Sequence, residues 1–334
     1  MDDKIRLEHG SGGLLSRELI EEIIYPALKN VSYPALTDGT DISCTQSMCM
    51  TTDTYVVEPV FFPGGDIGKL AVFGTCNDLA VSGAKPRYLS LGFVLEEGFE
   101  IEKLLRILTS IARAAAEASV AIVTGDTKVV PAGKGGGIYI NSCGIGEKRF
   151  DGKLATESCQ PGDAVILSGP VGAHGITVLG AREGLPVGEA VKSDCANLYP
   201  LCKELHPLGS SLRFMRDATR GGVAAVLNEA VSDQLFGFQI SEADIPVDPD
   251  VQAAADILGL NPYEIANEGV FIAVVAPETA DDAVKHLSKH REGKCAAVIG
   301  TVVQENPGKV ILETRIGGRR LLDIPRGLLL PRIC

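Results

Sequence analysis

Hydrophobic and polar residues follow two different periods along the first half of the chain. Between residues 100 and 119 the apolar positions recur every three or four residues and define one face of a helix. Residues 66–84 carry small and apolar side chains at a similar helical spacing. The intervening segments are rich in threonine and in β-branched or aromatic residues, which favours strands. We expect these strands at 48–57, 87–95, 120–130 and 135–146, the third interrupted by a turn at Gly125–Asp126.

The pattern restarts after a polar and charged stretch at 146–163, which is the best candidate for a linker. Beyond it, strands are predicted at 164–172, 271–277, 295–303 and 309–316, and helices near 174–183, 194–205, 221–233 and 279–290. The sequence therefore predicts an α/β fold of the α+β type. We divide it into two α/β domains, 1–155 and 156–320, followed by a movable tail over 321–334.

The composition is that of a globular protein: of 334 residues, 45% are hydrophobic and 22% are charged. The formal net charge of −12 argues against nucleic acid or an anionic membrane as the main partner, because both repel an acidic surface. We expect no signal peptide in the acidic N-terminal residues, and no apolar run approaches the roughly 20 residues that span a bilayer. Nine cysteines without a Cys-x-x-Cys pair are typical of free thiols, so we expect a cytoplasmic protein.

Four aspartates lie in short motifs that the pattern places at strand ends or turns. The motifs are TTDTY, CNDLA, TGDTKV and RDATRGG, which contain Asp53, Asp78, Asp126 and Asp217. Carboxylates flanked by threonine and small residues are suitable ligands for Mg²⁺ around a polyphosphate. A single aspartate of this kind is usually a turn residue that bonds its own backbone. Four together favour the metal-binding interpretation.

Glycine-rich segments precede two of the predicted helices. HGSGG at 9–13 is followed by a helical stretch, and TRGG at 219–222 opens the helix near 221–233. Such segments can close backbone N–H groups around phosphate, although each alone is more typical of an ordinary turn. The segment GGDIGKL at 64–70 is one residue short of a phosphate-binding loop and has Leu70 where Ser or Thr would bind Mg²⁺. No G-x-G-x-x-G follows a strand, so an ATP site here would have another geometry.

Three further residues are candidates for chemistry. Lys128 lies two residues after Asp126, so it would point to the same side of a strand. Glu268 lies among small and polar residues in ANEG, and His174 lies where a helix begins. Without a role in chemistry, Lys128 would be a solvated surface residue, Glu268 a turn residue, and His174 a helix-capping or packing residue.

The last residues, IPRGLLLPRIC, contain two prolines and a glycine. These residues disfavour regular structure and favour a movable arm that carries the thiol of Cys334. The alternative is an ordinary frayed terminus.

Taken in order, these motifs resemble the HypE family of hydrogenase maturation proteins, within the superfamily of aminoimidazole ribonucleotide synthetase, selenophosphate synthetase and thiamine-phosphate kinase. The resemblance rests on HGSGG, the block at 51–90, VTGDTKVV, RDATRGGV, ANEG and the terminal PRIC, and it covers essentially the whole chain. It implies two domains of the aminoimidazole ribonucleotide synthetase-like fold. It also implies a homodimer in which two small sheets join into a barrel-like interface, with ATP between the domains and part of the site completed by the partner.

The resemblance also implies roles for individual residues. Cys334 would carry the reacting group, Glu268 and Lys128 would remove protons and polarise the oxygen, and His174 would have a positioning role. Mg²⁺ would be held by Asp53, Asp78, Asp126 and Asp217. The implied ATP-binding residues are His9, Gly10, Ser11, Gly12, Gly13, Asp53, Lys69, Asn77, Asp78, Asp126, Thr127, Asp217, Thr219 and Gly221.

The activity that the resemblance implies is ATP-dependent dehydration of a carbamoyl group on Cys334 to a thiocyanate. The carbamoyltransferase HypF would supply that group, and a HypC–HypD complex would accept the cyanide for the iron of a [NiFe] hydrogenase. Two alternatives stay open. A selenophosphate synthetase would need a reactive cysteine beside a lysine near the N-terminus, and no cysteine precedes Cys44. A thiol carrier would bind ATP without catalysing the dehydration.

Overall fold

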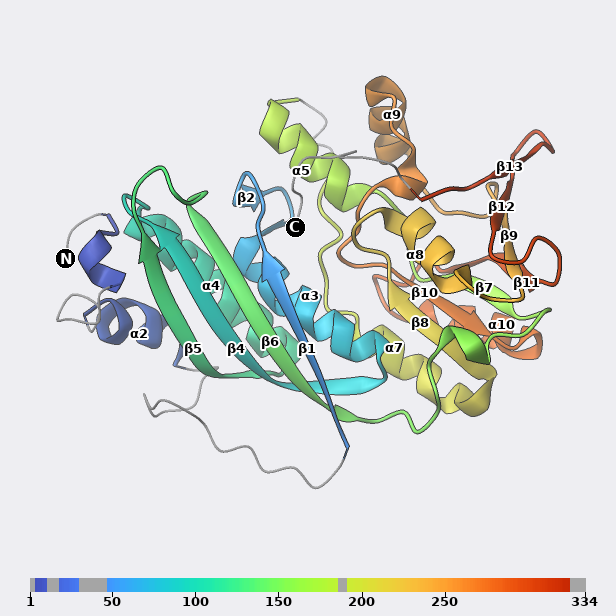
Figure 1. Ribbon diagram of the computed structural model, residues 1–334, viewed down its shortest axis with the longest axis horizontal. Helices are drawn as coiled ribbons and strands as arrows, with labels where there is room; N and C mark the ends of the chain where they lie inside the picture. Colours follow the sequence, from blue (N-terminus) through green and yellow to red (C-terminus); the bar gives the residue numbers. More distant parts are fainter. Residues whose placement is uncertain (1–3, 11–17, 30–46, 186–190, 325–334) are drawn as a thin grey trace.

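The computed structural model describes residues 4–10, 18–29, 47–185 and 191–324, and its strands form two main sheets (Figure 1). The first sheet has the strand order β1-β6-β4-β5, in which β4 and β5 run parallel and the other neighbours antiparallel. A short hairpin, β2–β3, lies beside it. The strands are β1 (Met48–Tyr55), β2 (Phe61–Phe62), β3 (Gly65–Asp66), β4 (Ala84–Glu96), β5 (Ala121–Val130) and β6 (Ile138–Lys148).

Two long helices, α3 and α4, cover one face of this sheet and pack against each other (Figure 1). α4 is amphipathic and buries the predicted apolar face, including Leu104 and Ile111. α3 begins where Asp66 Oδ1 accepts hydrogen bonds from the backbone N–H groups of Gly68 and Lys69, at 2.8 and 3.1 Å. It is buried along almost its whole length, because it also contacts α7 and β8 of the second half. The helical elements of this half are η1 (Leu7–Gly10), η2 (Leu19–Ile24), α2 (Tyr25–Leu28), α3 (Ile67–Val81) and α4 (Ile101–Ala118).

The second sheet has the order β13-β12-β9-β11-β7-β10-β8. Its central strands are buried on both faces, because α8 packs against one face and α7 with α10 against the other. In β10, for example, Ile272 faces α8 and Ala273 faces α10. The strands are β7 (Ala164–Leu167), β8 (Leu212–Asp217), β9 (Gly237–Ser241), β10 (Phe271–Val275), β11 (Ala297–Val303), β12 (Val310–Glu313) and β13 (Arg319–Leu321). The helices are η3 (Thr156–Ser158), α5 (Ala173–Glu183), α7 (Tyr199–Leu205), η4 (His206–Ser211), α8 (Gly222–Val231), α9 (Pro249–Leu258), η5 (Pro262–Glu264), η6 (Pro277–Thr279) and α10 (Ala280–Leu287).

The architecture is the predicted α/β arrangement of the α+β type, with local differences. β5 runs without interruption through Gly125 and Asp126, so the predicted turn is wrong. Both residues pair with β4, and a Cβ on Gly125 would lie 2.4 Å from the carbonyl oxygen of Leu91, which explains the glycine. The helix expected near 194–205 begins only at Tyr199, because the backbone N–H groups of Ser193, Ala196 and Leu198 bond to distant segments. β8, β9 and α9 are absent from the sequence predictions.

Two segments flank the second sheet: the linker that precedes it and the chain that follows its last strand. Residues 149–163 link the two sheets and contain only the turn η3. Strand pairing includes Leu321, the first residue of the predicted tail, and the N–H of Leu322 donates to the carbonyl of Val310 at 3.0 Å. Cys334 lies outside the described residues. None of the described helices combines the length and apolarity that crossing a membrane requires.

Candidate active site

Three of the four aspartates predicted to bind metal come from elements that meet at α3. Asp53 lies on β1, Asp78 lies on α3, and Asp217 is the last residue of β8. Thr51 Oγ1 on β1 donates a hydrogen bond to Asp78 Oδ2 at 2.8 Å, which ties α3 to β1 at this point. The prediction that these aspartates lie at strand ends or turns is wrong for Asp53 and Asp126, which lie within strands, and for Asp78, which lies within a helix.

The three carboxylates act on one another electrostatically. Burial raises the pKa of Asp217 to about 7, with the negative charge of Asp78 as the next contribution and that of Asp53 as a smaller one. Burial also raises the pKa of Asp78, against the Thr51 hydrogen bond, and the charge of Asp53 raises it further. A cation would relieve this repulsion. The cluster therefore fits Mg²⁺ together with the phosphate oxygens that Mg²⁺ accompanies.

Asp126 lies apart from this cluster, on the opposite face of the first sheet. Thr54, Asn141, Gly92 and Asp126 stand opposite one another across β1, β6, β4 and β5, so they share one face. Asp53 shares the other face with its pair partner Ser142, whose Oγ donates to the α3 carbonyl of Ala71. β1 and β5 are three strand spacings apart, about 14 Å. Within one chain Asp126 therefore does not join the other aspartates, and the described residues contain no three acidic, histidine or cysteine side chains that could hold a metal ion by themselves.

Lys128 lies on the same face as Asp126, as predicted. Its Nζ is 3.1 Å from Asp126 Oδ2. Thr127 points to the other side, and its N–H donates to Asp126 Oδ1 at 2.8 Å. α3 and α4 leave the Asp126 face uncovered, and Asn141 is exposed there with Lys128. As far as the described residues show, this face is accessible to another molecule.

Glu268 lies in a buried loop between η5 and β10, residues 266–269. The neighbouring Asn267 holds the loop in place: its Oδ1 accepts from the N–H of Gly172 and its Nδ2 donates to the carbonyl of Ala218, both at 2.7 Å. Asp194 Oδ2 accepts from the N–H of Glu268 at 3.0 Å. Sequence reasoning missed Asn267 and Asp194, although Asn267 is itself part of the ANEG motif that drew attention to Glu268.

The side chain of Glu268 is close to the aspartate cluster. Tyr55 on β1 is buried, and burial is the main cause of its raised pKa. The charges of Asp53, Glu268 and Asp78 all raise that pKa further, so all three carboxylates act electrostatically on the same tyrosine. The catalytic role of Glu268 stays a prediction.

His174 is buried at the start of α5, where the chain passes the β2–β3 hairpin. Its Nδ1 lies 2.9 Å from Ser193 Oγ. Phe62 of β2 meets the imidazole edge-on, with 5.4 Å between ring centroids and an interplanar angle of 84°. The ring is therefore fixed between the two halves of the molecule.

Asn77 and Lys69, both on α3, make structural contacts in this chain. The Asn77 side chain bonds three backbone groups: its Nδ2 donates to the carbonyls of Ala196 and Glu268 at 3.0 and 3.3 Å, and its Oδ1 accepts from the N–H of Leu198 at 2.8 Å. Lys69 Nζ donates to the carbonyl of Gly64 at 2.9 Å. Asn77 thus joins α3 to the second half, next to the aspartate cluster.

The glycine-rich segments fall partly within the described residues. His9 is buried in η1, where its Nδ1 accepts from the N–H of Arg6 at 3.0 Å, and Gly10 ends that turn. Ser11, Gly12 and Gly13 lie outside the described residues. Thr219 and Gly221 form the turn directly after Asp217 that opens α8, and Gly221 has the positive φ of 73° that favours glycine.

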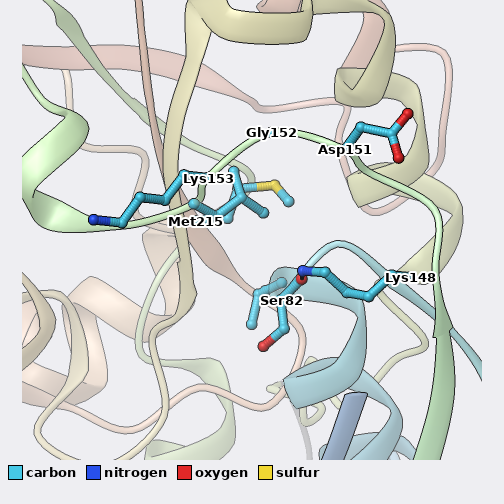
Figure 2. A pocket seen from close by; sticks show the side chains of 8 residues that line it. Ser82, Lys148, Asp151, Gly152, Lys153 and Met215 are labelled. Atoms are coloured by element: carbon cyan, nitrogen blue, oxygen red, sulfur yellow. Dashed lines mark hydrogen bonds between the residues drawn. The ribbon is translucent and has the colours of Figure 1, made fainter. Parts of the chain in front are cut away.

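A cavity of about 470 Å³ lies at the C-terminal end of α3, where Val81 and Ser82 line it, one helical turn beyond Asp78 (Figure 2). Ser82, Lys148, Asp151, Lys153 and Met215 are among the residues that line it, and none of the predicted site residues does. Lys148 Nζ already donates to the carbonyl of Ser82 at 2.6 Å. The cavity therefore does not compete with the aspartate cluster as the site of chemistry.

Comparison with known proteins identifies the family of the chain. Residues 35–147 match the family described as AIR synthase related protein, N-terminal domain, and residues 160–313 match the corresponding C-terminal domain. The chain is 46% identical over 333 residues to the carbamoyl dehydratase HypE of Rhizobium leguminosarum bv. viciae, covering 99% of this chain and 95% of that protein. It is similar to a solved structure of the hydrogenase maturation protein HypE in complex with ATP, with a TM-score of 0.94, 42% identity and coverage of 98% and 99% of the two chains. It is also similar to a chain of a HypE–HypF complex, with a TM-score of 0.80, 42% identity and coverage of 83% of this chain and 90% of that chain.

The two domain matches and the paired sheets define the general class, that of proteins related to AIR synthase. Within this class, the chain belongs to the HypE family of hydrogenase maturation proteins. The resemblance that the sequence motifs carry is thereby confirmed.

Proposed function

We propose that this protein is an ATP-dependent carbamoyl dehydratase acting on a carbamoyl group carried by the thiol of its own Cys334. The product is a thiocyanate, which supplies the cyanide ligand for [NiFe]-hydrogenase iron. The observation that carries the proposal is that Asn77, the residue before Asp78 on α3, donates to the backbone carbonyl of the buried Glu268 at 3.3 Å, which brings Glu268 next to the helix that carries Asp78. A proton acceptor beside a cluster suited to Mg²⁺ and phosphate is what such a dehydration requires.

We infer that Asp53, Asp78 and Asp217 hold Mg²⁺ against the phosphates of ATP. The raised pKa values of Asp217 and Asp78 support this, because burial and mutual repulsion outweigh the opposing charge of Arg216 at both carboxylates. The turn containing Thr219 follows Asp217 directly and is placed for the phosphates. The similar HypE structure in complex with ATP supports the nucleotide.

The chemistry follows from the poor leaving ability of an amide oxygen. Bound ATP would supply the phosphoryl group that turns this oxygen into a leaving group. The oxygen departs with that group as phosphate, and the nitrogen gives up both of its protons. The carbamoyl group thus loses the elements of water and becomes a nitrile. We assign acceptance of a proton to the Glu268 carboxylate, and orientation of the amide to His174, whose ring Ser193 holds.

We infer that the working unit is a homodimer. Within one chain Asp126 and Lys128 lie on the uncovered face of the first sheet, away from Asp53 and Asp78. We propose that a second copy joins this sheet along its edge strand β1, which carries Asp53, so that the Lys128 and Asp126 of that copy complete the site. There Lys128 would polarise the amide oxygen. The closed point symmetry of most homo-oligomers would then give two equivalent sites.

The proposed function also implies partner proteins, a cellular compartment and a role for each domain. The HypE–HypF complex supports HypF as the protein that carbamoylates Cys334, and we propose a HypC–HypD complex as the cyanide acceptor. We place the reaction in the cytoplasm, where nine cysteines without a Cys-x-x-Cys pair would stay reduced. Residues 1–155 would form the ATP-binding and dimerisation domain, 156–320 the second domain, and 321–334 the tail that carries the substrate.

Phosphate release tests the proposal. The full chain is carbamoylated by HypF, mixed with Mg²⁺ and ATP, and compared with Cys334→Ala treated in the same way. The proposal predicts one phosphate released for each carbamoyl group converted, and none from the alanine variant. A carrier that binds ATP without catalysis would release no phosphate in step with loss of the carbamoyl group, and this result would overturn the proposal.

A further inference from the structure

We propose that Asp194 is a positioning residue for the dehydration: its carboxylate fixes the backbone of Glu268 and so determines where the Glu268 carboxylate meets the substrate. This inference rests on the proposed function, in which Glu268 removes a proton. It concerns a residue that carries no motif in the sequence.

A single carboxylate oxygen makes the contact. Asp194 Oδ2 accepts hydrogen bonds from the backbone N–H of Glu268 at 3.0 Å and from that of Gly269 at 2.8 Å. Glu268 and Gly269 are buried, so a lost acceptor would leave unsatisfied N–H groups that water does not readily replace. The two bonds fix the course of the chain through residue 268, and with it the direction of the Glu268 side chain.

The main chain of Asp194 also packs against the 266–269 loop. A Cβ at residue 269 would lie 1.9 Å from the carbonyl oxygen of Asp194, so glycine is required there. On the other side of the loop, Asn77 Nδ2 donates to the carbonyl oxygen of Glu268 at 3.3 Å. Glu268 is thus held at its N–H by Asp194 and at its C=O by Asn77.

The segment that carries Asp194 is itself fixed to the first half of the molecule. The N–H of Ser193 donates to the carbonyl of Pro63 in the β2–β3 hairpin at 2.9 Å. Asn77 on α3 bonds the carbonyl of Ala196 at 3.0 Å. Because α3 also carries Asp78, these contacts link the position of Glu268, in the second half, to that of the aspartate cluster.

Ser193, the residue before Asp194, orients His174, the other candidate group for the reaction. Ser193 Oγ lies 2.9 Å from His174 Nδ1, while it accepts from the N–H of Cys195 at 3.1 Å. Two consecutive residues, Ser193 and Asp194, therefore orient His174 and Glu268. What the two loop N–H groups require of residue 194 is an acceptor at the right distance, and a neutral amide oxygen meets that requirement as well as a carboxylate does.

The test compares Asp194→Asn with Asp194→Glu in the full, carbamoylated chain. Asparagine keeps an acceptor oxygen at the native distance from the main chain, whereas glutamate keeps the charge but is one methylene longer. The measured quantities are the single-turnover rate constant of thiocyanate formation and the ATP concentration that gives half the maximal rate. We expect the asparagine variant to stay within about 10-fold of the native rate and the glutamate variant to be about 100-fold slower, with the ATP concentration changed by less than about 2-fold.

Three results would overturn the inference. One is the reverse order, in which the glutamate variant is active and the asparagine variant slow, since charge and not position would then matter. Another is equal rates in both variants. The third is weakened ATP binding that parallels the loss of rate, which a general loss of structure would produce.

Glu268→Gln separates this inference from the proposed function. If Glu268→Gln keeps the native rate, Glu268 is no proton acceptor and the proposed mechanism fails with the inference. If Glu268→Gln is inactive while both Asp194 variants react at the native rate, the proposed function stands and the positioning role of Asp194 is refuted.

Discussion

Asp78 on α3 lies close enough to Asp217, the last residue of β8, that burial and the charge of Asp78 together raise the pKa of Asp217 to about 7. The ordinary value for this group is 3.8. Between the two values the folded protein binds more protons at Asp217 than the unfolded chain does. The folded state is therefore favoured by protonation of this group, and the metal-binding state by its ionisation.

The first prediction concerns pH. The contribution of Asp217 to the free energy of unfolding of the ligand-free protein should be present below about pH 4 and should be lost as the pH rises towards about 7. Over the upper part of this range the affinity for Mg²⁺–ATP should rise, because binding requires the ionised carboxylate. Urea unfolding and ATP titration as functions of pH measure the two effects. Asp217→Asn cannot titrate and should flatten the unfolding profile, and an unchanged profile in that variant would contradict the assignment.

The second prediction concerns the aspartate on α3. Asp78→Asn should lower the rate constant of thiocyanate formation by about 10²- to 10³-fold, the usual cost of removing one charge-stabilising group from an active site. Asp151→Asn is the matched control, because Asp151 is an exposed aspartate that lines the cavity beyond the C-terminal end of α3 and is none of the predicted site residues (Figure 2). It should leave the rate unchanged. Equal losses in the two variants would show that net charge, and not the site, determines the rate.

The third prediction tests whether two copies share a site. Lys128→Ala and Asp78→Asn should each be inactive alone, since each removes one half of both sites in a dimer. Mixed under conditions that exchange subunits, they should restore about a quarter of the native sites, because half of the dimers are mixed and each mixed dimer keeps one intact site. Single-turnover rapid quench measures the restored amplitude. No recovery after verified exchange would place Lys128 and Asp78 in the site of one chain.

The fourth prediction concerns Asn77. The three hydrogen bonds of its amide join α3 to Ala196, Leu198 and Glu268, so Asn77→Ala should lower the free energy of unfolding by about 2–4 kcal/mol even without nucleotide. Asn141→Ala is the control, because its amide also bonds the chain but is exposed on the uncovered sheet face. Urea unfolding of the ligand-free variants makes the comparison. A native stability with weakened ATP binding would instead identify Asn77 as a nucleotide ligand.

The sequence predicted the elements whose side chains repeat a clear period. α4 has one strongly apolar face and was predicted within one residue at each end. β8 and β9 escaped prediction because LRFMRD and GFQIS mix charged or polar residues with apolar ones over five or six positions. α7 was predicted too long because the backbone N–H groups of Ser193, Ala196 and Leu198 bond to distant segments, which no local pattern records.

The residues of the candidate site also divide into those that the sequence predicts and those whose positions depend on distant contacts. Asp53, Asp78 and Asp217 were predicted from local motifs in which aspartate lies beside threonine or small residues, and the role of Glu268 was predicted from the family resemblance. The separation of Asp126 from them depends on the strand order β1-β6-β4-β5, which the sequence does not reveal. Asp194 and Asn267 act through the backbone of other loops, and such contacts become visible only when the chain is folded.

The measurement that tests the central claim most directly is the intact mass of the C-terminal peptide of the carbamoylated protein, with and without Mg²⁺–ATP. If Cys334 carries a substrate that this protein dehydrates, ATP makes the peptide lighter by one water, and Cys334→Ala never carries the adduct. If the carbamoyl mass persists while ATP is present, the thiol is only a carrier, and the dehydration belongs to another protein.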